Sequence, residues 1–265
     1  MRLHPFLEFG APIALAHRGG AREHPENTMA AFEAVIRSGY RYLDLDTQST
    51  ADGVLVIYRS NAIQASAGAK DEISALPYER IAQMRLGDSE RIPRLTDILG
   101  TFPQAKFNLR LTTDAATQAF IAAARGGGVL ERICVASNSL TRLETVREAF
   151  GDEVCTALAP SEIFRMSLGA SGLPSGAIGG RCVQVPLTWP AGLGLWHLDE
   201  RFISTAHAAS MPVLVGIVDD KADMIRLIEL GVDGLMTDRP ALLQAVLESN
   251  GMWWRADSAA RRKIV

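Results

Sequence analysis

The stretch IALAHRGG, from Ile13 to Gly20, places a histidine and an arginine directly after a short apolar run. A second stretch, LDLD from Leu43 to Asp46, carries two carboxylates two positions apart. Because side chains alternate between the two faces of a strand, Asp44 and Asp46 share one face. A base, a guanidinium and two carboxylates at the ends of adjacent strands favour a site that handles phosphate.

The rest of the chain repeats the combination of strand and helix. Short apolar runs alternate with segments of helical periodicity, a pattern typical of βα units around a parallel sheet. The runs predict eight strands, over residues 13–16, 42–46, 106–111, 133–136, 154–158, 182–185, 213–218 and 234–237. We therefore predict an α/β fold, a (β/α)8 TIM barrel, with its chemistry at the C-terminal ends of the strands.

Turn and capping signals mark the connections. Residues 54–57 follow the second strand too closely to form a crossover strand, and we predict a hairpin arm that folds back over the barrel mouth. Asn27 or Thr28 is predicted to cap the first helix, Asp220 a later one, and Asp238 the last one.

Length and composition limit the other possibilities. The 265 residues fit one large domain, which we place at residues 1–250, followed by a basic tail at residues 251–265. A formal net charge of -3 does not indicate the basic surface that nucleic-acid-binding proteins carry. No apolar run reaches the roughly 18 residues of a transmembrane segment, and the N-terminus lacks the apolar core of a signal peptide. We therefore expect a cytoplasmic protein, and the sequence leaves its oligomeric state open.

The three cysteines, Cys134, Cys155 and Cys182, are widely spaced and form no CxxC pair. This spacing predicts neither a disulfide framework nor a zinc site. We expect them to be small core residues of three strands.

Several motifs resemble the glycerophosphodiester phosphodiesterase family. They are HRG at residues 17–19, PENT at residues 25–28, DLD at residues 44–46 and GVDGLMTDRP at residues 231–240. Their order and spacing cover nearly the whole chain. The resemblance implies a TIM barrel that hydrolyses a phosphodiester, such as a glycerophosphodiester, to an alcohol and a phosphomonoester. It also implies a small excursion over the C-terminal face of the barrel, at about residues 60–95.

The resemblance also implies roles for individual residues. His17 matches one of the family's two acid/base histidines, and Arg18 is expected to contact phosphate. Glu26 lies beside the histidine in the family's site and is counted with the substrate-binding residues. Asp46 matches a metal-ligand carboxylate, and Asp44 stands where the family usually has glutamate. Mg²⁺ or Ca²⁺ is the cofactor that the family implies.

Further positions depart from the family pattern. Arg59 stands where the hairpin arm of the family ends in the second acid/base histidine. A guanidinium cannot transfer protons near neutral pH, because its pKa is above about 12. Arg110 stands where the family supplies a glutamate metal ligand, so the local charge is reversed. Gly216 replaces a tryptophan of many relatives, which is expected to remove an apolar wall.

The two arginines lead to an electrostatic hypothesis. Buried carboxylates need compensating charge, and Arg59 and Arg110 can supply it in place of a metal ion. We therefore expect an Asp–Arg network without bound metal, and Asp44 and Asp46 are metal ligands only if a metal binds at all. Together with Arg18, the two arginines form a candidate pocket for a small phosphodiester or another phosphate-bearing ligand.

Three functions fit these observations. The first is a phosphoric diester hydrolase with an atypical site, in which His17 remains for acid/base work and the arginines stabilise oxyanions. His24 is a candidate for the missing acid. The second function is a catalytically inactive relative that binds a phosphate-containing ligand. The third is a scaffold with an ion-paired barrel mouth.

Overall fold

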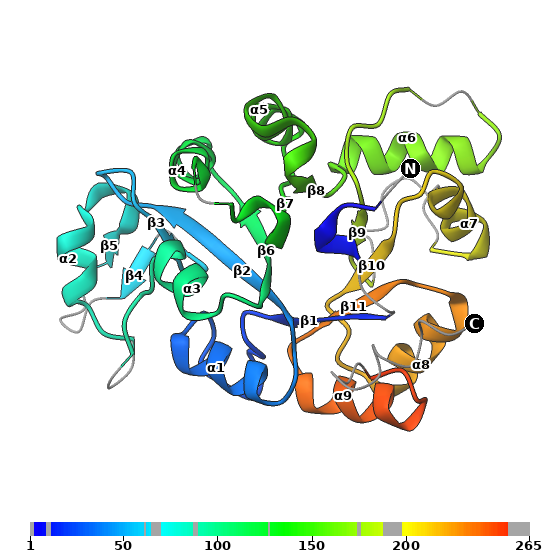
Figure 1. The fold of residues 1–265 in the computed structure, drawn as a ribbon, viewed down its shortest axis with the longest axis horizontal. Coiled ribbons are helices and arrows are strands. Elements are labelled where there is room, and N and C mark those ends of the chain that lie inside the picture. Colours follow the sequence, from blue (N-terminus) through cyan, green and yellow to red (C-terminus); the bar gives the residue numbers. More distant parts are fainter. Residues whose placement is uncertain are drawn as a thin grey trace.

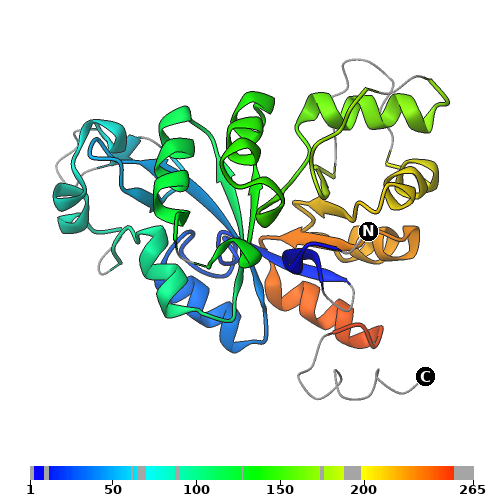
Figure 2. The same ribbon diagram turned by 45° about the horizontal axis from the view of Figure 1, so that its top comes forward.

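The fold is a ring of parallel strands inside a layer of helices (Figures 1 and 2). The computed structural model describes residues 3–8, 12–60, 62–64, 70–86, 90–126, 128–173, 176–187 and 198–253. The strand path runs β8-β7-β6-β2-β1-β11-β10-β9, and β3 adds a ninth strand to this sheet by pairing with β2. Neighbours along the path are parallel, whereas β3 is antiparallel to β2.

The strands of the large sheet are β1 (Ile13–His17), β2 (Tyr42–Ser49), β3 (Leu55–Ile57), β6 (Lys106–Leu111), β7 (Ile133–Ala136), β8 (Cys155–Thr156), β9 (Val183–Val185), β10 (Val213–Gly216) and β11 (Gly234–Thr237). The α-helices are α1 (Met29–Arg37), α2 (Tyr78–Gln83), α3 (Leu95–Thr101), α4 (Asp114–Ala124), α5 (Leu140–Phe150), α6 (Pro160–Ala170), α7 (Glu200–Ala208), α8 (Lys221–Leu230) and α9 (Pro240–Ser249). Short 3-10 helices are η1 (Pro5–Leu7), η2 (Ile73–Ala75), η3 (Leu130–Arg132) and η4 (Gly151–Glu153).

The two ends of the strand path meet and close the barrel. A parallel bridge pairs Ala157, after β8, with Cys182, before β9. The amide of Leu158 donates to the Cys182 carbonyl at 2.9 Å, and the amide of Arg181 donates to the Thr156 carbonyl at 2.7 Å. The prediction of a TIM barrel is therefore confirmed, with a join that is shorter than the other strand pairs.

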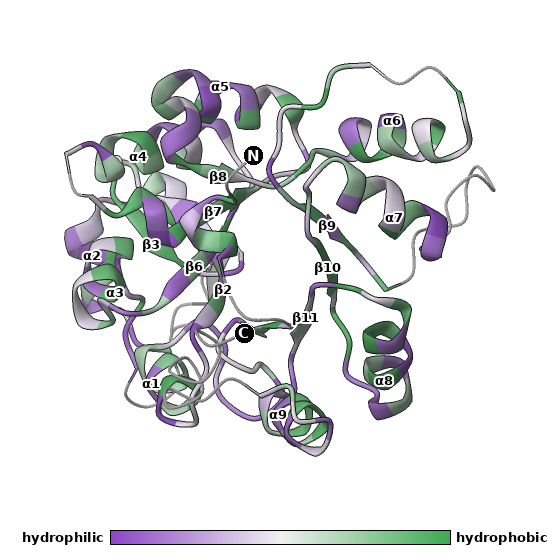
Figure 3. Ribbon diagram, turned by 45° about the vertical axis from the view of Figure 1, so that its right-hand side comes forward, coloured by the Kyte–Doolittle hydropathy of each residue, from purple (hydrophilic) through white to green (hydrophobic). Residues whose placement is uncertain are grey.

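Alternation along the strands separates an outer core from an inner core. In β2, Leu43 and Leu45 pack in the large cluster between strands and helices, whereas Tyr42 belongs to a second cluster inside the barrel. The inner cluster also contains Phe6 of η1, and the hydroxyl of Tyr42 donates to its carbonyl at 2.7 Å. Figure 3 shows the apolar strands at the centre of the molecule with the helices around them. Asp44 and Asp46 share the inner face with Tyr42, so the barrel directs both carboxylates into its interior.

The sequence located every barrel strand, but some boundaries differ. The second strand continues to Ser49, because its last residues pair with the antiparallel arm β3. The predicted strand at residues 154–158 is reduced to two residues in β8. Thr28 caps α1 by accepting from the amide of Ala31. The prediction that Asp238 caps the last helix is wrong, since α9 begins at Pro240.

The excursion at residues 60–95 is more ordered than expected. It contains the hairpin of β4 (Ala62–Gln64) and β5 (Lys70–Glu72), followed by η2 and α2. A separate small core of Val56, Ile73, Ile81 and Ile92 holds it against β3. Figure 1 shows α2 beside the far end of β2, at the left of the barrel.

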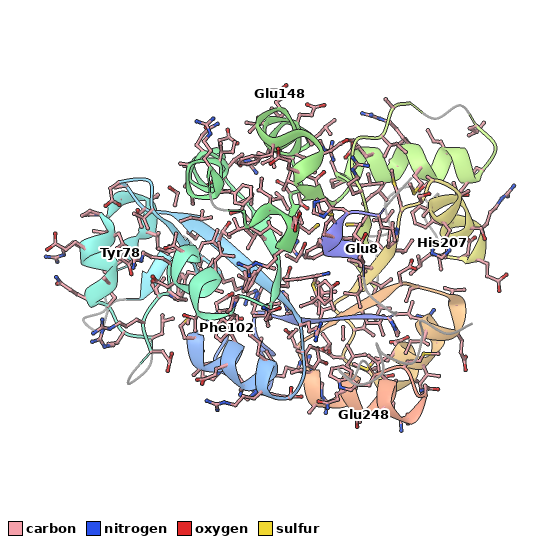
Figure 4. All side chains as sticks on the ribbon, viewed as in Figure 1. Glu8, Tyr78, Phe102, Glu148, His207 and Glu248 are labelled. Carbon is pink, nitrogen blue, oxygen red and sulfur yellow. The ribbon has the colours of Figure 1, made fainter. Side chains whose placement is uncertain are left out.

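The outer helix faces carry polar side chains. Figure 4 shows Glu148 on α5 and Glu248 on α9 at the edge of the molecule, and both residues are exposed, as is His207 on α7. Among the described residues, no helix combines the length and apolarity that crossing a membrane requires. Most of the predicted basic tail, residues 254–265, lies outside the described residues.

Candidate functional site

Charged side chains meet where three neighbouring strands end. In the strand register His17 of β1 is opposite Asp44 of β2, and Asp46 is opposite Arg110 of β6. Because these are the C-terminal ends of parallel strands, the side chains face one another across the mouth of the barrel. The structure thus brings together four residues that the sequence selected from segments far apart in the chain.

A tight turn after His17 sets the direction of the next side chain. Arg18 has a φ of 53°, and Gly20 has a φ of 86°. A Cβ atom at Gly20 would lie 2.6 Å from the Cγ of Pro240, so only glycine lets α9 approach this closely. The amide of Arg18 donates to the Asp44 carbonyl at 2.9 Å. The turn therefore folds the guanidinium of Arg18 back over the end of β2.

His17 is held by a carboxylate from the opposite end of the chain. Its Nδ1 lies 2.6 Å from the Oδ1 of Asp238, and its Nε2 lies 3.7 Å from the Oδ2 of Asp44. The His17 side chain is 7% exposed, so its orientation is restricted. Burial alone would raise the pKa of the Asp238 carboxyl, but its hydrogen bond with His17 and the charges of nearby basic groups lower it. This arrangement leaves Nε2 facing the mouth, where a general base acts.

Asp46 is neutralised mainly by Arg18. The Nε of Arg18 lies 2.5 Å from the Oδ2 of Asp46 in an ion pair that lacks hydrogen-bond alignment, and its Nη1 donates to Glu26 at 3.0 Å. Burial alone would lower the pKa of Arg18, but the two carboxylates raise it, so the guanidinium stays charged. The buried amide of Asn27 contacts Asp46 at 3.4 Å. Asn27 therefore helps to orient the Asp46 carboxylate, whereas Thr28 is the N-cap of α1.

Asp44 is fully buried and only partly satisfied. Its Oδ1 accepts from the side-chain amide of Asn108, which in turn is hydrogen-bonded to Gln184. Its Oδ2 has no hydrogen-bond partner among the described residues and lies 4.0 Å from the Nη2 of Arg110. A buried carboxylate oxygen without a donor is costly. Asp44 Oδ2 therefore depends on the positive charge of Arg110, at 4.0 Å, and on the nearby His17.

Arg59 does not reach the aspartates. Its side chain is 64% exposed, and its Nη1 lies 4.0 Å from Glu26 at the rim of the mouth. The expected pairing of both arginines with Asp44 and Asp46 is thus corrected: Arg18 and Arg110 supply the positive charge. The Nε of Arg110 lies 3.8 Å from Asp46, and its side chain is 35% exposed. Arg110 can therefore contact both the carboxylates and a ligand in the mouth.

The mouth opens on one side into a pocket of about 480 Å³. Arg110 lies at this pocket, and Ile163, Leu214 and Met236 give it an apolar lining. Gly216 also lines it, and a Cβ atom there would lie 2.4 Å from the Cβ of Met236. A tryptophan cannot fit at this position without moving β11. The prediction that Gly216 removes an apolar wall is wrong, because side chains of the neighbouring strands line the pocket with apolar surface.

The divalent cation of the family does not fit these side chains. Mg²⁺ and Ca²⁺ need several converging oxygen ligands. Both oxygens of Asp46 already face arginines, and the guanidinium of Arg110 lies within 4.0 Å of Asp44 as well. A dication between the aspartates would be repelled by this guanidinium at short range. The contacts of Arg18 and Arg110 with Asp46 therefore leave a poor ligand set for a divalent cation.

Four residues of the site were missed from the sequence: Asp238, Asn27, Asn108 and Gln184. Asp238 follows β11 directly, and this position at the C-terminal end of a barrel strand was the available signal. Asn108 and Gln184 lie inside strands, where a single polar residue in an apolar run marks the inner face. His207, by contrast, pairs with Asp233 on the outer surface at 2.7 Å.

Comparisons with known proteins identify relatives of this chain. The model of the "Glycerophosphoryl diester phosphodiesterase family" matches residues 17–152 and 180–242. "Probable glycerophosphodiester phosphodiesterase 2" of Mycobacterium tuberculosis is 28% identical over 255 residues, covering 94% of this chain and 95% of that protein.

Solved structures share the fold. A glycerophosphodiester phosphodiesterase from Agrobacterium tumefaciens has a TM-score of 0.70 at 22% identity and covers 88% of this chain and 99% of its own. An Oleispira antarctica phosphodiesterase, solved with the product sn-glycerol-3-phosphate, has a TM-score of 0.71 at 20% identity and covers 90% and 97%. With the family model matching most of the sequence, this chain belongs to the glycerophosphoryl diester phosphodiesterase family.

Proposed function

We propose that this protein hydrolyses phosphodiesters of the glycerophosphodiester type without a divalent metal ion. The observation that carries the proposal is the buried His17, aligned by Asp238, beside two arginines at the mouth of the barrel. His17 takes at Nε2 a proton of the attacking water, whose oxygen bonds to phosphorus as the bond to the leaving alcohol breaks. Asp238 holds the ring in one orientation and stabilises the imidazolium that forms.

Arg18 and Arg110 bind the phosphoryl oxygens in this proposal. Both guanidiniums contact the Asp46 carboxylate, Arg18 at Oδ2 and Arg110 at Oδ1, so a phosphate bound beside this carboxylate would lie near both. Guanidinium groups pair with phosphate oxygens in a bidentate manner and remain charged throughout the reaction. They supply fixed positive charge where the transition state gains negative charge.

Leaving-group protonation is the weak step of this site. A second proton-transfer group typically contributes about 10²- to 10⁴-fold to the rate, and Arg59 cannot act as one. We therefore expect the rate to depend steeply on the pKa of the leaving alcohol. Esters with acidic leaving groups react well, and ordinary glycerophosphodiesters react slowly.

The test is a series of glycerophosphate and methyl phosphate diesters whose aryl leaving groups differ in pKa. We expect a steep decrease of kcat with leaving-group pKa, no decrease with a chelator, and loss of activity in His17→Ala. A His24→Ala variant tests the remaining candidate acid. If His24 protonates the leaving group, its loss makes the dependence of kcat on leaving-group pKa steeper. A flat dependence together with activation by Mg²⁺ or Ca²⁺ contradicts the proposal.

The exposed Arg59 favours a second candidate, a phosphate-binding protein without turnover. In that case inorganic phosphate or glycerol phosphate raises the thermal midpoint, while every ester of the series stays intact. Arg18→Met and Arg110→Met remove the stabilisation, and an arginine-to-methionine change on the outside, Arg37→Met, leaves it. Turnover abolished by His17→Ala would exclude this candidate.

A further inference from the structure

The chain has three cysteines, and the fold brings all of them to one place. Cys134 comes from β7, Cys155 from β8, and Cys182 precedes β9. Their sulfur atoms all lie within 4.8 Å of one another, and the Sγ atoms of Cys134 and Cys182 are 3.8 Å apart. All three side chains are 0% exposed. The three cysteine side chains lie inside the barrel, away from the charged side chains of the mouth.

The register of the strands places this cluster directly under the pocket. Each cysteine is followed two positions later by a residue of the pocket lining: Ala136, Ala157 and Gln184. Residues two positions apart lie on the same face of a strand, so the cysteines form the next layer of the barrel interior. Two of the three covering side chains are only methyl groups. The layer above the sulfurs is therefore thin, and it opens toward the pocket.

We propose that Cys134, Cys155 and Cys182 form a binding site for a thiophilic divalent cation, Zn²⁺. Three thiolates at about 2.3 Å from a tetrahedral Zn²⁺ lie about 3.8 Å apart, which agrees with the distance between Cys134 and Cys182. Nothing in the spacing of these residues along the sequence indicates the site, because it depends on neighbouring strands of the closed barrel. The fourth ligand position faces the layer of Gln184.

The balance of charge is consistent with a divalent ion. Binding replaces three thiol protons by one Zn²⁺, which gives a centre of net charge -1 and releases three protons to solvent. Lys106, on the inner face of β6, interacts electrostatically with Cys155. Its ammonium lies near Tyr42, 3.2 Å from the hydroxyl, at the closed end of the barrel. The positive charge of Lys106 therefore offsets part of the negative charge of the centre.

The test uses the full chain, reduced with a phosphine and refolded with Co²⁺ as a spectroscopic probe of Zn²⁺. Refolding with the ion present removes burial as an obstacle to entry. We expect about one Co²⁺ per chain, an ultraviolet sulfur-to-cobalt charge-transfer band and the intense visible bands of tetrahedral cobalt. Zn²⁺ displaces the Co²⁺ and abolishes both signals. Zn²⁺ also raises the thermal midpoint.

Variants Cys134→Ala, Cys155→Ala and Cys182→Ala each remove one ligand. We expect each to weaken Zn²⁺ binding by more than about 100-fold, since even residues behind a metal ligand contribute about 10- to 100-fold. Ile13→Val is the matched control, because it shrinks a side chain of the same inner cluster without removing a thiol. Circular dichroism verifies that each variant folds.

Two results would overturn the site. One is a folded wild-type protein, with three titratable thiols, that shows no charge-transfer band with Co²⁺ and retains no Zn²⁺ after desalting. The other is metal retention that stays the same in the three cysteine variants. Neither result bears on the hydrolase proposal, since the activity of the barrel mouth is measured separately and in the presence of a chelator.

Discussion

The Nδ1 of His17 lies 2.6 Å from the Oδ1 of Asp238, although 221 positions separate the two residues in the chain. The pairing is possible because β1 and β11 are neighbours in the barrel, with Ala16 opposite Thr237. Asp238 is in turn held by Asp219, whose carboxylate accepts from the Asp238 amide at 2.8 Å. The base of the proposed reaction is therefore positioned by the junction of the first and last strands.

Asp238→Asn is expected to lower kcat by about 10²- to 10⁴-fold on the most reactive aryl ester, with a small change in KM. The amide keeps the shape of the side chain but no longer stabilises the imidazolium. Steady-state kinetics measure both parameters. Asp233→Asn is the matched control, because Asp233 pairs with His207 at 2.7 Å outside the mouth. Equal kinetics in the two variants would exclude a role for Asp238 in catalysis.

The stability of the protein should decrease in acid partly through Asp238. The pKa of its carboxyl is lowered in the folded protein, whereas the unfolded value is about 3.9. Between the two values the unfolded chain binds a proton that the folded protein does not, so stability falls as pH decreases through this window. Above the unfolded value the contribution is fully present. Urea unfolding at pH 7, 4 and 3 should show a smaller acid-induced loss in Asp238→Asn than in the wild type.

Glu162→Ala is expected to destabilise the fold by about 3–5 kcal/mol, the usual effect of removing one partner of a buried ion pair. Glu162 on α6 is 2% exposed and accepts from both terminal nitrogens of Arg147 on α5, at 2.9 and 3.0 Å. The exposed pair of Glu33 and Arg37 serves as the control, and Glu33→Ala should cost less than about 1 kcal/mol. Urea unfolding measures both. Similar losses of unfolding free energy in Glu162→Ala and Glu33→Ala would show that the Arg147–Glu162 pair is not desolvated.

Arg110→Glu is expected to create or strengthen affinity for Mg²⁺ or Ca²⁺ at the mouth. The change puts a third carboxylate beside Asp44 and Asp46 and removes a guanidinium that lies within 4.0 Å of both. Isothermal titration calorimetry should detect stoichiometric binding in the variant. Arg59→Glu makes the same change of charge at the rim, 4.0 Å from Glu26, and should not bind the ion. Tight binding by the unchanged protein would contradict the arginine-for-metal hypothesis.

The strand pattern and the site-bearing motifs were predictable because they depend on local rules. Alternation puts Asp44 and Asp46 on one face, whatever surrounds them. The apolar runs and turn signals located the strands that a closed barrel then joined. The family resemblance placed His17, Arg18 and Arg110 at strand ends, where parallel strands always gather their C-terminal residues.

Which of these groups interact was decided by the tertiary structure. Arg18, rather than Arg59, pairs closely with Asp46, because the positive φ of Arg18 turns its side chain back onto β2. Asp238 met His17 only when the first and last barrel strands paired, and Cys182 met Cys134 only when the two ends of the strand path closed the barrel. Sequence patterns determine which face of a strand a side chain occupies, whereas distances across a barrel depend on how the strands are ordered and closed.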